Sequence, residues 1–191
     1  SWKLLLGGRF YRTQIDGTET FSGVVADAAS AQVLRSESVS VSSAGFSPKA
    51  SLTYKPGRDF LAYATASRGF QYGGVNFVPF ATDRVDPTFE SSTLWNYEAG
   101  VRTDWLERTL RMDLTAFFID WSNAQVSQYT QPYNDLVVSN VGAVRNRGVE
   151  WTLRYLPGFL PGLSLETTGS YTMARTAAPF VGINNQQVEP G

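Results

Sequence analysis

A strict alternation between polar and apolar side chains runs through the middle of the chain, in the stretch "NYEAGVRTDW" at 96–105. The residues of one parity are Asn96, Glu98, Gly100, Arg102 and Asp104. The residues of the other parity are Tyr97, Ala99, Val101, Thr103 and Trp105. A period of two predicts a β-strand with one polar and one apolar face. In a soluble sheet the apolar face would be the core, whereas in a membrane barrel it would contact lipid and the polar face would line the lumen.

The composition excludes several classes of function. Among the 191 residues, 16 Lys and Arg stand against 17 Asp and Glu, so no basic excess points to nucleic acid. The chain contains no Cys and no His, which excludes disulfides, the usual zinc sites and a Ser-His-Asp triad. No window approaches the roughly 18 uninterrupted apolar residues of a transmembrane helix. We therefore expect neither an enzyme nor a bound cofactor.

Seven runs of the sequence are predicted to form strands. They lie at 2–14, 45–55, 60–70, 92–105, 109–122, 137–155 and 163–175. The connections between them alternate in length. The short ones are "KPGRD" (55–59), "LERT" (106–109) and "YLPGFLPG" (155–162), and the long ones are 15–44, 71–91, 123–136 and 176 onward. Bacterial outer-membrane barrels have short periplasmic turns and longer extracellular loops, so this asymmetry favours an antiparallel up-and-down β-barrel over a soluble sandwich.

The short connections also predict strand registers. If Leu106 faces Thr109, the polar face carries two pairs of opposite charge, Asp104 with Arg111 and Arg102 with Asp113. The apolar face then carries the pairs Trp105–Leu110, Thr103–Met112, Val101–Leu114, Ala99–Ala116 and Tyr97–Phe118. The same rule, with Pro56 facing Asp59, predicts the pairs Tyr54–Leu61 and Leu52–Tyr63.

Two tryptophans bracket the apolar stripe of the central strand. Trp95 and Trp105 are ten residues apart, so in a strand their side chains lie on the same face. With a rise of about 3.3 Å per residue and a strand tilt near 40°, they are roughly 25 Å apart along a membrane normal. That spacing matches the apolar band of an outer-membrane barrel, which has aromatic residues at both edges.

Four stretches are similar to successive strands of TonB-dependent outer-membrane receptors. They are "LAYATASRGFQYGGVN" (61–76), "NYEAGVRTDWLERTLRMDLTAFFIDWSNAQVS" (96–127), "NVGAVRNRGVEWTLRY" (140–155) and "GLSLETTGSYTMA" (162–174). The chain departs from the family pattern at Arg102, where Lys is common, and at Val144, where Ala is common. Each motif alone is weak, but four in order at the family's spacing are specific.

The resemblance implies a barrel of about 22 strands that encloses an N-terminal plug. It implies active import of a scarce nutrient, typically a ferric siderophore, across the outer membrane of a Gram-negative bacterium, with energy from the TonB complex. We expect residues 1–191 to be part of the barrel domain without the plug, an incomplete arc of about seven strands within a longer chain. The expected partners are membrane lipid, the nutrient ligand and the TonB complex, the last through the missing N-terminal region.

The resemblance orients the two faces and suggests site residues. The residues expected to line the lumen are Asn96, Glu98, Arg102, Asp104, Arg111, Asp113 and Glu150. The candidate ligand contacts on extracellular loops are Phe70, Tyr72, Phe77, Phe80, Arg84, Tyr129 and Tyr133, because aromatic rings there suit stacking on a ligand. These rings could instead pack on one another or form the interfacial belt. Arg68 and Arg84 could attract an anionic ferric complex or be solvated rim charges. For Glu150 we expect a salt bridge within the wall, and we expect Arg145 and Arg147 near the outer rim.

Two other functions remain open at this point. One is a passive porin-like barrel or an outer-membrane adhesin, which would lack the plug of an energised transporter. The other is a secreted all-β binding module, which would purify without detergent. Specificity is a property of the site and not of the fold, so the sequence does not identify the substrate.

Overall fold

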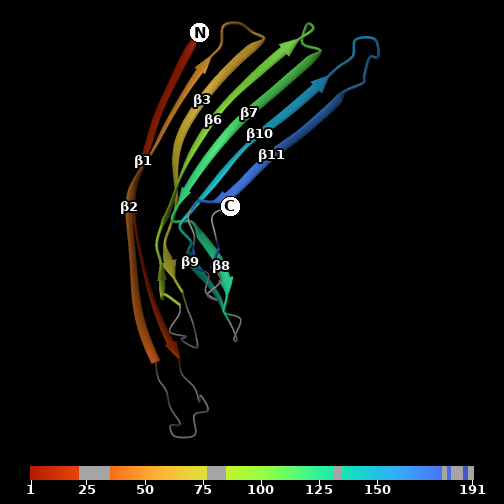
Figure 1. The fold of residues 1–191 in the computed structure, drawn as a ribbon. Helices are drawn as coiled ribbons and strands as arrows, with labels where there is room; N and C mark the ends of the chain where they lie inside the picture. Colours follow the sequence, from red (N-terminus) through yellow and green to blue (C-terminus); the bar gives the residue numbers. More distant parts are fainter. Residues whose placement is uncertain (22–34, 77–84, 131–134, 178–179, 182–186, 189–191) are drawn as a thin grey trace.

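The computed structural model describes residues 1–21, 35–76, 85–130, 135–177, 180–181 and 187–188. Seven strands form one antiparallel sheet whose spatial order follows the chain, with β1 and β11 at its edges (Figure 1). They are β1 (Trp2–Phe21), β2 (Arg35–Tyr54), β3 (Phe60–Gln71), β6 (Ser92–Trp105), β7 (Leu110–Ser122), β10 (Ala143–Tyr155) and β11 (Leu165–Thr176). The sheet is curved and open, so the predicted all-β, up-and-down arc of seven strands is confirmed.

The two ends of the sheet differ. Three short connections, at 55–59, 106–109 and 156–164, gather at the end that we call the turn end. The described parts of the long connections lie at the opposite end, the loop end, and include small antiparallel hairpins (Figure 1). These hairpins are β4 (Gly74–Val75) with β5 (Thr88–Phe89), β8 (Gln125–Tyr129) with β9 (Leu136–Asn140), and β12 (Phe180–Val181) with β13 (Gln187–Val188). Within the described ranges, no helix is long and apolar enough to cross a membrane.

The first hairpin is longer than the sequence predicted. We expected a loop over 15–44, but β1 and β2 stay paired as far as Phe21 and Arg35. The stretch "SVSVSS" (38–43) in this part of the hairpin alternates Ser with Val39 and Val41, so it carries only a short alternating signal and no large apolar side chain. Hydroxyl pairs hold it across the ladder instead, with Thr13 and Ser43 2.7 Å apart and Thr18 and Ser38 3.0 Å apart.

The predicted strand over 137–155 is two strands. A break at Val141 and Gly142 separates β9 from β10. Gly142 has a φ of 78°, which glycine adopts without strain. Its carbonyl accepts a hydrogen bond of 2.8 Å from the N–H of Ala124, and Val141 donates back to the Ala124 carbonyl at 2.7 Å. The break therefore turns the chain from the sheet into the β8–β9 hairpin.

The register of β6 and β7 is the predicted one. All five apolar pairs occur, from Trp105–Leu110 to Tyr97–Phe118, and so do both charged pairs. The turn closes through the N–H and the hydroxyl of Thr109, which donate to the Leu106 carbonyl at 3.0 and 2.7 Å.

The predicted register of β2 and β3 is wrong by one residue. Tyr54 pairs with Ala62 and not with Leu61, and Leu52 pairs with Ala64. The physical reason is that β3 begins against β6 before it meets β2, because Phe60 already pairs with Thr103. A slip of one residue moves every side chain to the other face of a strand, so Leu61 and Tyr63 lie on the polar face.

Cross-strand pairing connects the seven strands into rows that give the sheet two distinct faces. One row on the first face consists of Trp2, Tyr54, Ala62, Val101, Leu114, Trp151 and Gly169. The next row consists of Leu4, Leu52, Ala64, Ala99, Ala116, Val149 and Tyr171. Neither row contains a charged residue, and we call this surface the apolar face. The surface on the other side of the sheet is the polar face, and one of its rows is Lys3, Thr53, Tyr63, Gly100, Thr115, Glu150 and Ser170.

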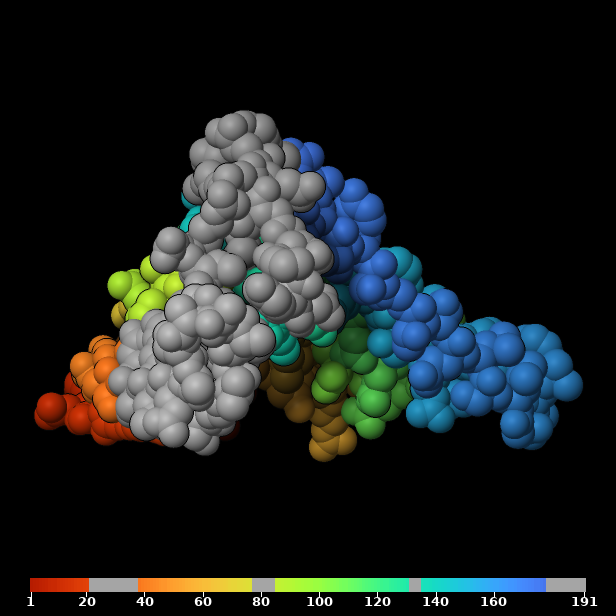
Figure 2. Space-filling model, turned by 90° about the horizontal axis from the view of Figure 1, so that it is seen from below, coloured from red at the N-terminus to blue at the C-terminus, as the bar shows by residue number. Residues whose placement is uncertain are grey.

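The apolar face is uncovered. Large side chains on it are open to the surroundings, with Trp2 67% and Tyr171 60% exposed. Among the described residues the fully enclosed apolar side chains are instead Ala124, Val137 and Val141, all at the loop end. Seen along the sheet from the loop end, β1 and β2 form one side of the molecule and β10 and β11 the other (Figure 2). An apolar sheet surface of this extent needs an apolar environment.

Candidate functional site

The middle of the polar face carries the two predicted ion pairs. Arg111 Nε donates to Asp104 Oδ1 at 2.7 Å, and Arg111 Nη2 donates to Oδ2 at 3.2 Å. Arg102 Nε donates to Asp113 Oδ1. The Arg102 and Asp113 side chains are 60% and 30% exposed, so this pair contributes little to stability. The pairs instead give the polar face charges of both signs.

The other predicted lumen residues share this face. The side-chain amide of Asn96 donates to Glu98 Oε1 at 2.6 Å. Glu150 lies opposite Thr115 and Ser170, both neutral. Glu150 has no ion-pair partner among the described residues, so the expected wall salt bridge is not formed within this part of the chain.

Several polar atoms on this side of the sheet lack partners. The side-chain oxygens of Asn96 and Asn146 and the indole N–H of Trp121 are buried, and none is hydrogen-bonded within the described residues. Asn96 pairs with Ile119 and Ile119 with Asn146, so the two amides lie in one row. Buried polar atoms rarely stay unpaired, so we expect water or another polar surface to supply hydrogen-bond partners for these atoms on the polar face.

An aromatic group joins the middle of β1 to the loop end of β3. The rings of Tyr11 and Phe70 stack with centroids 3.5 Å apart, and Tyr72 meets Phe70 edge-on at 5.1 Å. The guanidinium of Arg9 lies 5.6 Å from the Phe70 ring centroid. We call Arg9, Tyr11, Phe70 and Tyr72 the aromatic rim cluster. Tyr72 is 42% exposed, so the cluster presents a ring surface beside a cation.

Amide side chains connect the β4–β5 hairpin to the β8–β9 hairpin at the loop end. The Asn76 side chain accepts from the Val138 N–H and donates to the Val138 carbonyl, both at 2.9 Å, as a neighbouring strand would. It also donates to the Asp86 carbonyl at 2.8 Å. Asn76 is only 8% exposed, so these bonds replace water that it cannot reach.

A second set of amides converges on Glu90. Its backbone carbonyl accepts from the side chains of Gln125 at 2.8 Å and Asn140 at 3.0 Å, and its N–H donates to the Asn140 side chain at 2.8 Å. Asn123 donates to the Glu90 carboxylate at 3.2 Å. We call Asn76, Asn123, Gln125 and Asn140 the amide network. Our sequence analysis missed its role, although all four residues lie in the stretches that resemble the receptor family.

The predicted ligand contacts are only partly brought together. Phe70 and Tyr72 meet in the aromatic rim cluster, whereas Tyr129 lies at the end of β8 and is 57% exposed. Phe77, Phe80, Arg84 and Tyr133 lie outside the described residues. In the part of the chain that the structure describes, no group of Asp and Glu side chains could hold a metal ion.

An open antiparallel sheet with an exposed apolar face and a polar face that carries charged pairs is the arrangement of a transmembrane β-barrel wall. Residues 1–189 match the family model described as "TonB dependent receptor-like, beta-barrel", so the chain belongs to this family. Proteins of this family are receptors of the Gram-negative outer membrane.

Known proteins agree with the family assignment. The chain is 28% identical over 151 residues to the metal-pseudopaline receptor CntO of Pseudomonas aeruginosa, a match that covers 78% of this chain and 19% of that protein. The chain thus spans about a fifth of the length of the curated relatives it matches.

Solved structures share the fold. The ferric yersiniabactin uptake receptor FyuA of Yersinia pestis superimposes with a TM-score of 0.66 at 19% identity, over 91% of this chain and 24% of that one. The ferric-catecholate import receptor Fiu of E. coli superimposes with a TM-score of 0.64 at 13% identity, over 92% of this chain and 26% of that one.

Proposed function

We propose that this chain forms an arc of the wall of an active outer-membrane transporter that binds and imports a scarce nutrient, a ferric siderophore or a related metal chelate. The match of residues 1–189 to the receptor barrel family carries the proposal. The names of the similar proteins, a metal-pseudopaline receptor and a ferric yersiniabactin uptake receptor, support this ligand class. Import would draw energy from the TonB complex through another part of the receptor.

In this proposal the apolar face contacts outer-membrane lipid and the polar face lines the lumen. The charge-free rows around Val101 and Val149 support the first assignment. The unpaired buried atoms of Asn96, Asn146 and Trp121 support the second, because a lumen supplies water or a plug surface to satisfy them. The turn end would then be periplasmic and the loop end extracellular.

Ligand capture would begin at the loop end. The aromatic rim cluster offers rings and the Arg9 cation, which together suit a flat, anionic chelate. The amide network would hold the surrounding hairpins in place, so that the capture surface is rigid. The other proposed contacts are Phe77, Phe80, Arg84, Tyr129 and Tyr133.

Replacing Tyr72, Phe77 and Phe80 together by Ala in the full-length receptor tests this proposal. Membrane assembly should be normal, because the proposal assigns the loop after β3 to the extracellular side, where its rings would not pack in the wall. Binding of the cognate chelate, found by screening ferric yersiniabactin, ferric catecholates and pseudopaline complexes, should be weakened. The control replaces Phe159, an exposed ring at the turn end, by Ala. Unchanged affinity in the triple variant would reject ligand capture by this loop, and failed assembly would show that the rings pack on one another.

A passive pore is the alternative function, and energy dependence separates the two. An active transporter should lose uptake of its chelate in cells without a functional TonB complex, whereas a passive pore should keep it. Uptake that persists without TonB would overturn the active-transport proposal.

A further inference from the structure

A row of charged side chains crosses the apolar face at its loop end. Cross-strand pairing places in this row Arg68, Trp95, Asp120, Arg145 and Arg175. Arg147 lies one row closer to the middle, between Phe118 and Met173. We call Arg145, Arg147 and Arg175 the arginine patch. The patch stands out because the rows next to it on the same face carry no charge.

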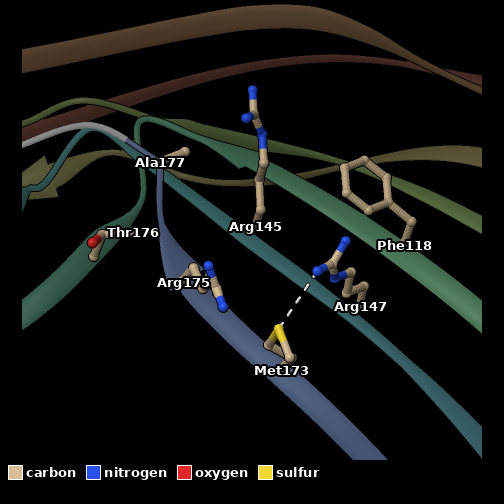
Figure 3. Close-up of a pocket in the computed structure, with 7 residues that line it drawn as sticks. All are labelled: Phe118, Arg145, Arg147, Met173, Arg175, Thr176 and Ala177. Carbon is tan, nitrogen blue, oxygen red and sulfur yellow. Dashed lines mark hydrogen bonds between the residues drawn. The ribbon is translucent and has the colours of Figure 1, made fainter. Parts of the chain in front are cut away.

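The arginine patch borders a cavity of about 250 Å³ (Figure 3). Arg145 and Arg147 come from β10 and Arg175 from β11. The remaining lining residues are Phe118, Met173, Thr176 and Ala177. The cavity therefore combines three guanidinium groups with apolar walls.

Among the described residues, most of the positive charge in the patch is unmatched. Arg145 Nε donates to Asp120 Oδ1 at 3.3 Å, and the Arg145 side chain is 59% exposed, so within the described ranges most of its five N–H donors are available. The guanidinium of Arg147 donates to the sulfur of Met173 at 3.6 Å, a weak acceptor. In the described ranges, neither Arg147 nor Arg175 has a carboxylate within ion-pair distance.

The place of the patch on the apolar face indicates the chemistry of its partner. Arg145 and Arg175 lie next to the loop ends of β10 and β11, where charged residues replace the apolar rows, and on an outer-membrane barrel this change marks the edge of the apolar band at the lipid headgroups. From the patch toward the turn end, the apolar face continues through Tyr171. A ligand that satisfies both regions has an anionic group joined to long apolar chains.

We propose that the arginine patch binds the phosphorylated headgroup of an outer-leaflet membrane lipid, with the acyl chains lying along the apolar face beside Phe118 and Tyr171. Guanidinium groups match phosphate oxygens with paired hydrogen bonds, and basic residues near a membrane surface attract anionic lipids. The proposal rests on the proposed function in one respect, because it requires the apolar face to lie in lipid.

The test uses the full-length receptor and lipid A as the probe, with dephosphorylated lipid A for comparison. The variant Arg145→Gln/Arg147→Gln/Arg175→Gln should bind lipid A roughly 100-fold more weakly, since each basic residue near an anionic lipid contributes about a fivefold factor. The matched control, Lys55→Gln/Arg58→Gln/Arg154→Gln, removes the same charge at the turn end and should bind like the wild type. Binding is measured by native mass spectrometry in detergent and by titration of receptor in nanodiscs.

Each outcome decides the proposal. Equal lipid A binding by the patch variant and the control variant overturns it, and so does inorganic phosphate competing as strongly as lipid A, which would identify a site for soluble anions. Should the triple variant not assemble, Arg147→Gln and Arg175→Gln, which break no ion pair among the described residues, should each weaken binding about fivefold.

Uptake of the ferric chelate, measured on the same variants, separates this proposal from the proposed function. Lost lipid binding with normal uptake supports the lipid site. Lost chelate binding with unchanged lipid binding would instead place the patch on the ligand path and overturn the lipid site. A wild-type receptor that imports no chelate but binds lipid A through the patch would reject the transport function alone.

Discussion

Replacing Val101 by Arg should destabilise the assembled receptor by about 2–4 kcal/mol. Val101 lies between Ala62 and Leu114 in a row without charge. It is four residues from Trp105 and six from Trp95, or about 10 Å and 15 Å along the membrane normal at 3.3 Å per residue and a tilt near 40°. This depth is near the bilayer midplane, where the penalty for a lipid-facing cation is largest.

The neighbouring change Arg102→Ala is the matched control. It removes the exposed ion pair with Asp113, and surface ion pairs contribute about 0–1 kcal/mol. The full-length receptor would be refolded into lipid vesicles and titrated with denaturant, and the free energy of unfolding compared between the variants and the wild type. Equal losses for the two variants, or a larger loss for Arg102→Ala, would refute the lipid-facing assignment of Val101.

Two further variants test local packing. Gly100→Ala should destabilise the receptor by about 1–2 kcal/mol, because a Cβ there would lie 2.6 Å from the Tyr63 ring, which is held by a 3.0 Å hydrogen bond between its hydroxyl and Thr115. Adding Tyr63→Ala should remove the steric clash, and thermal melts in which the double variant shows no such relief would contradict the contact between Gly100 and Tyr63. Asn76→Ala should speed hydrogen exchange at the Val138 amide by about tenfold or more, because its acceptor is lost, and unchanged exchange would show that Asn76 does not hold the hairpin.

Sequence alone predicted the β6–β7 pair because three signals agreed there. Alternation placed polar and apolar side chains on separate faces, the turn at 106–109 set the register, and the charges then matched across the ladder at Arg102–Asp113 and Asp104–Arg111. Each signal is local, so no knowledge of distant residues was needed.

The β2–β3 register could not be predicted in the same way, because "FLAYATAS" (60–67) has apolar residues at both its even and its odd positions. Phe60, Ala62 and Ala64 fit the apolar face as well as Leu61 and Tyr63 would. The choice depends on pairing with β6, which lies some 40 residues later in the chain. Tyr63 then obtains a partner for its hydroxyl on the polar face, Thr115.

The loop end was the least predictable part of the fold. Asn76 is hydrogen-bonded to the backbone of Val138, 62 residues away, and no periodic pattern in the sequence predicts such a contact. The aromatic signal at Phe70 and Tyr72 was visible in the sequence, but their partners Tyr11 and Arg9 come from β1. Single polar and aromatic residues in loops acquire their role only from tertiary structure.

Solvent accessibility of two adjacent positions on β10 tests the central claim most directly. Val149 lies in a charge-free row of the apolar face, and Glu150 lies on the polar face without an ion pair in the described structure. A spin label on Val149→Cys in the reconstituted full-length receptor should collide readily with oxygen dissolved in the bilayer and poorly with a water-soluble nickel complex. A label on Glu150→Cys should show the opposite pattern. Reversed accessibilities, or a water-accessible label at both positions, would contradict a wall with lipid on its apolar face and an aqueous lumen on its polar face.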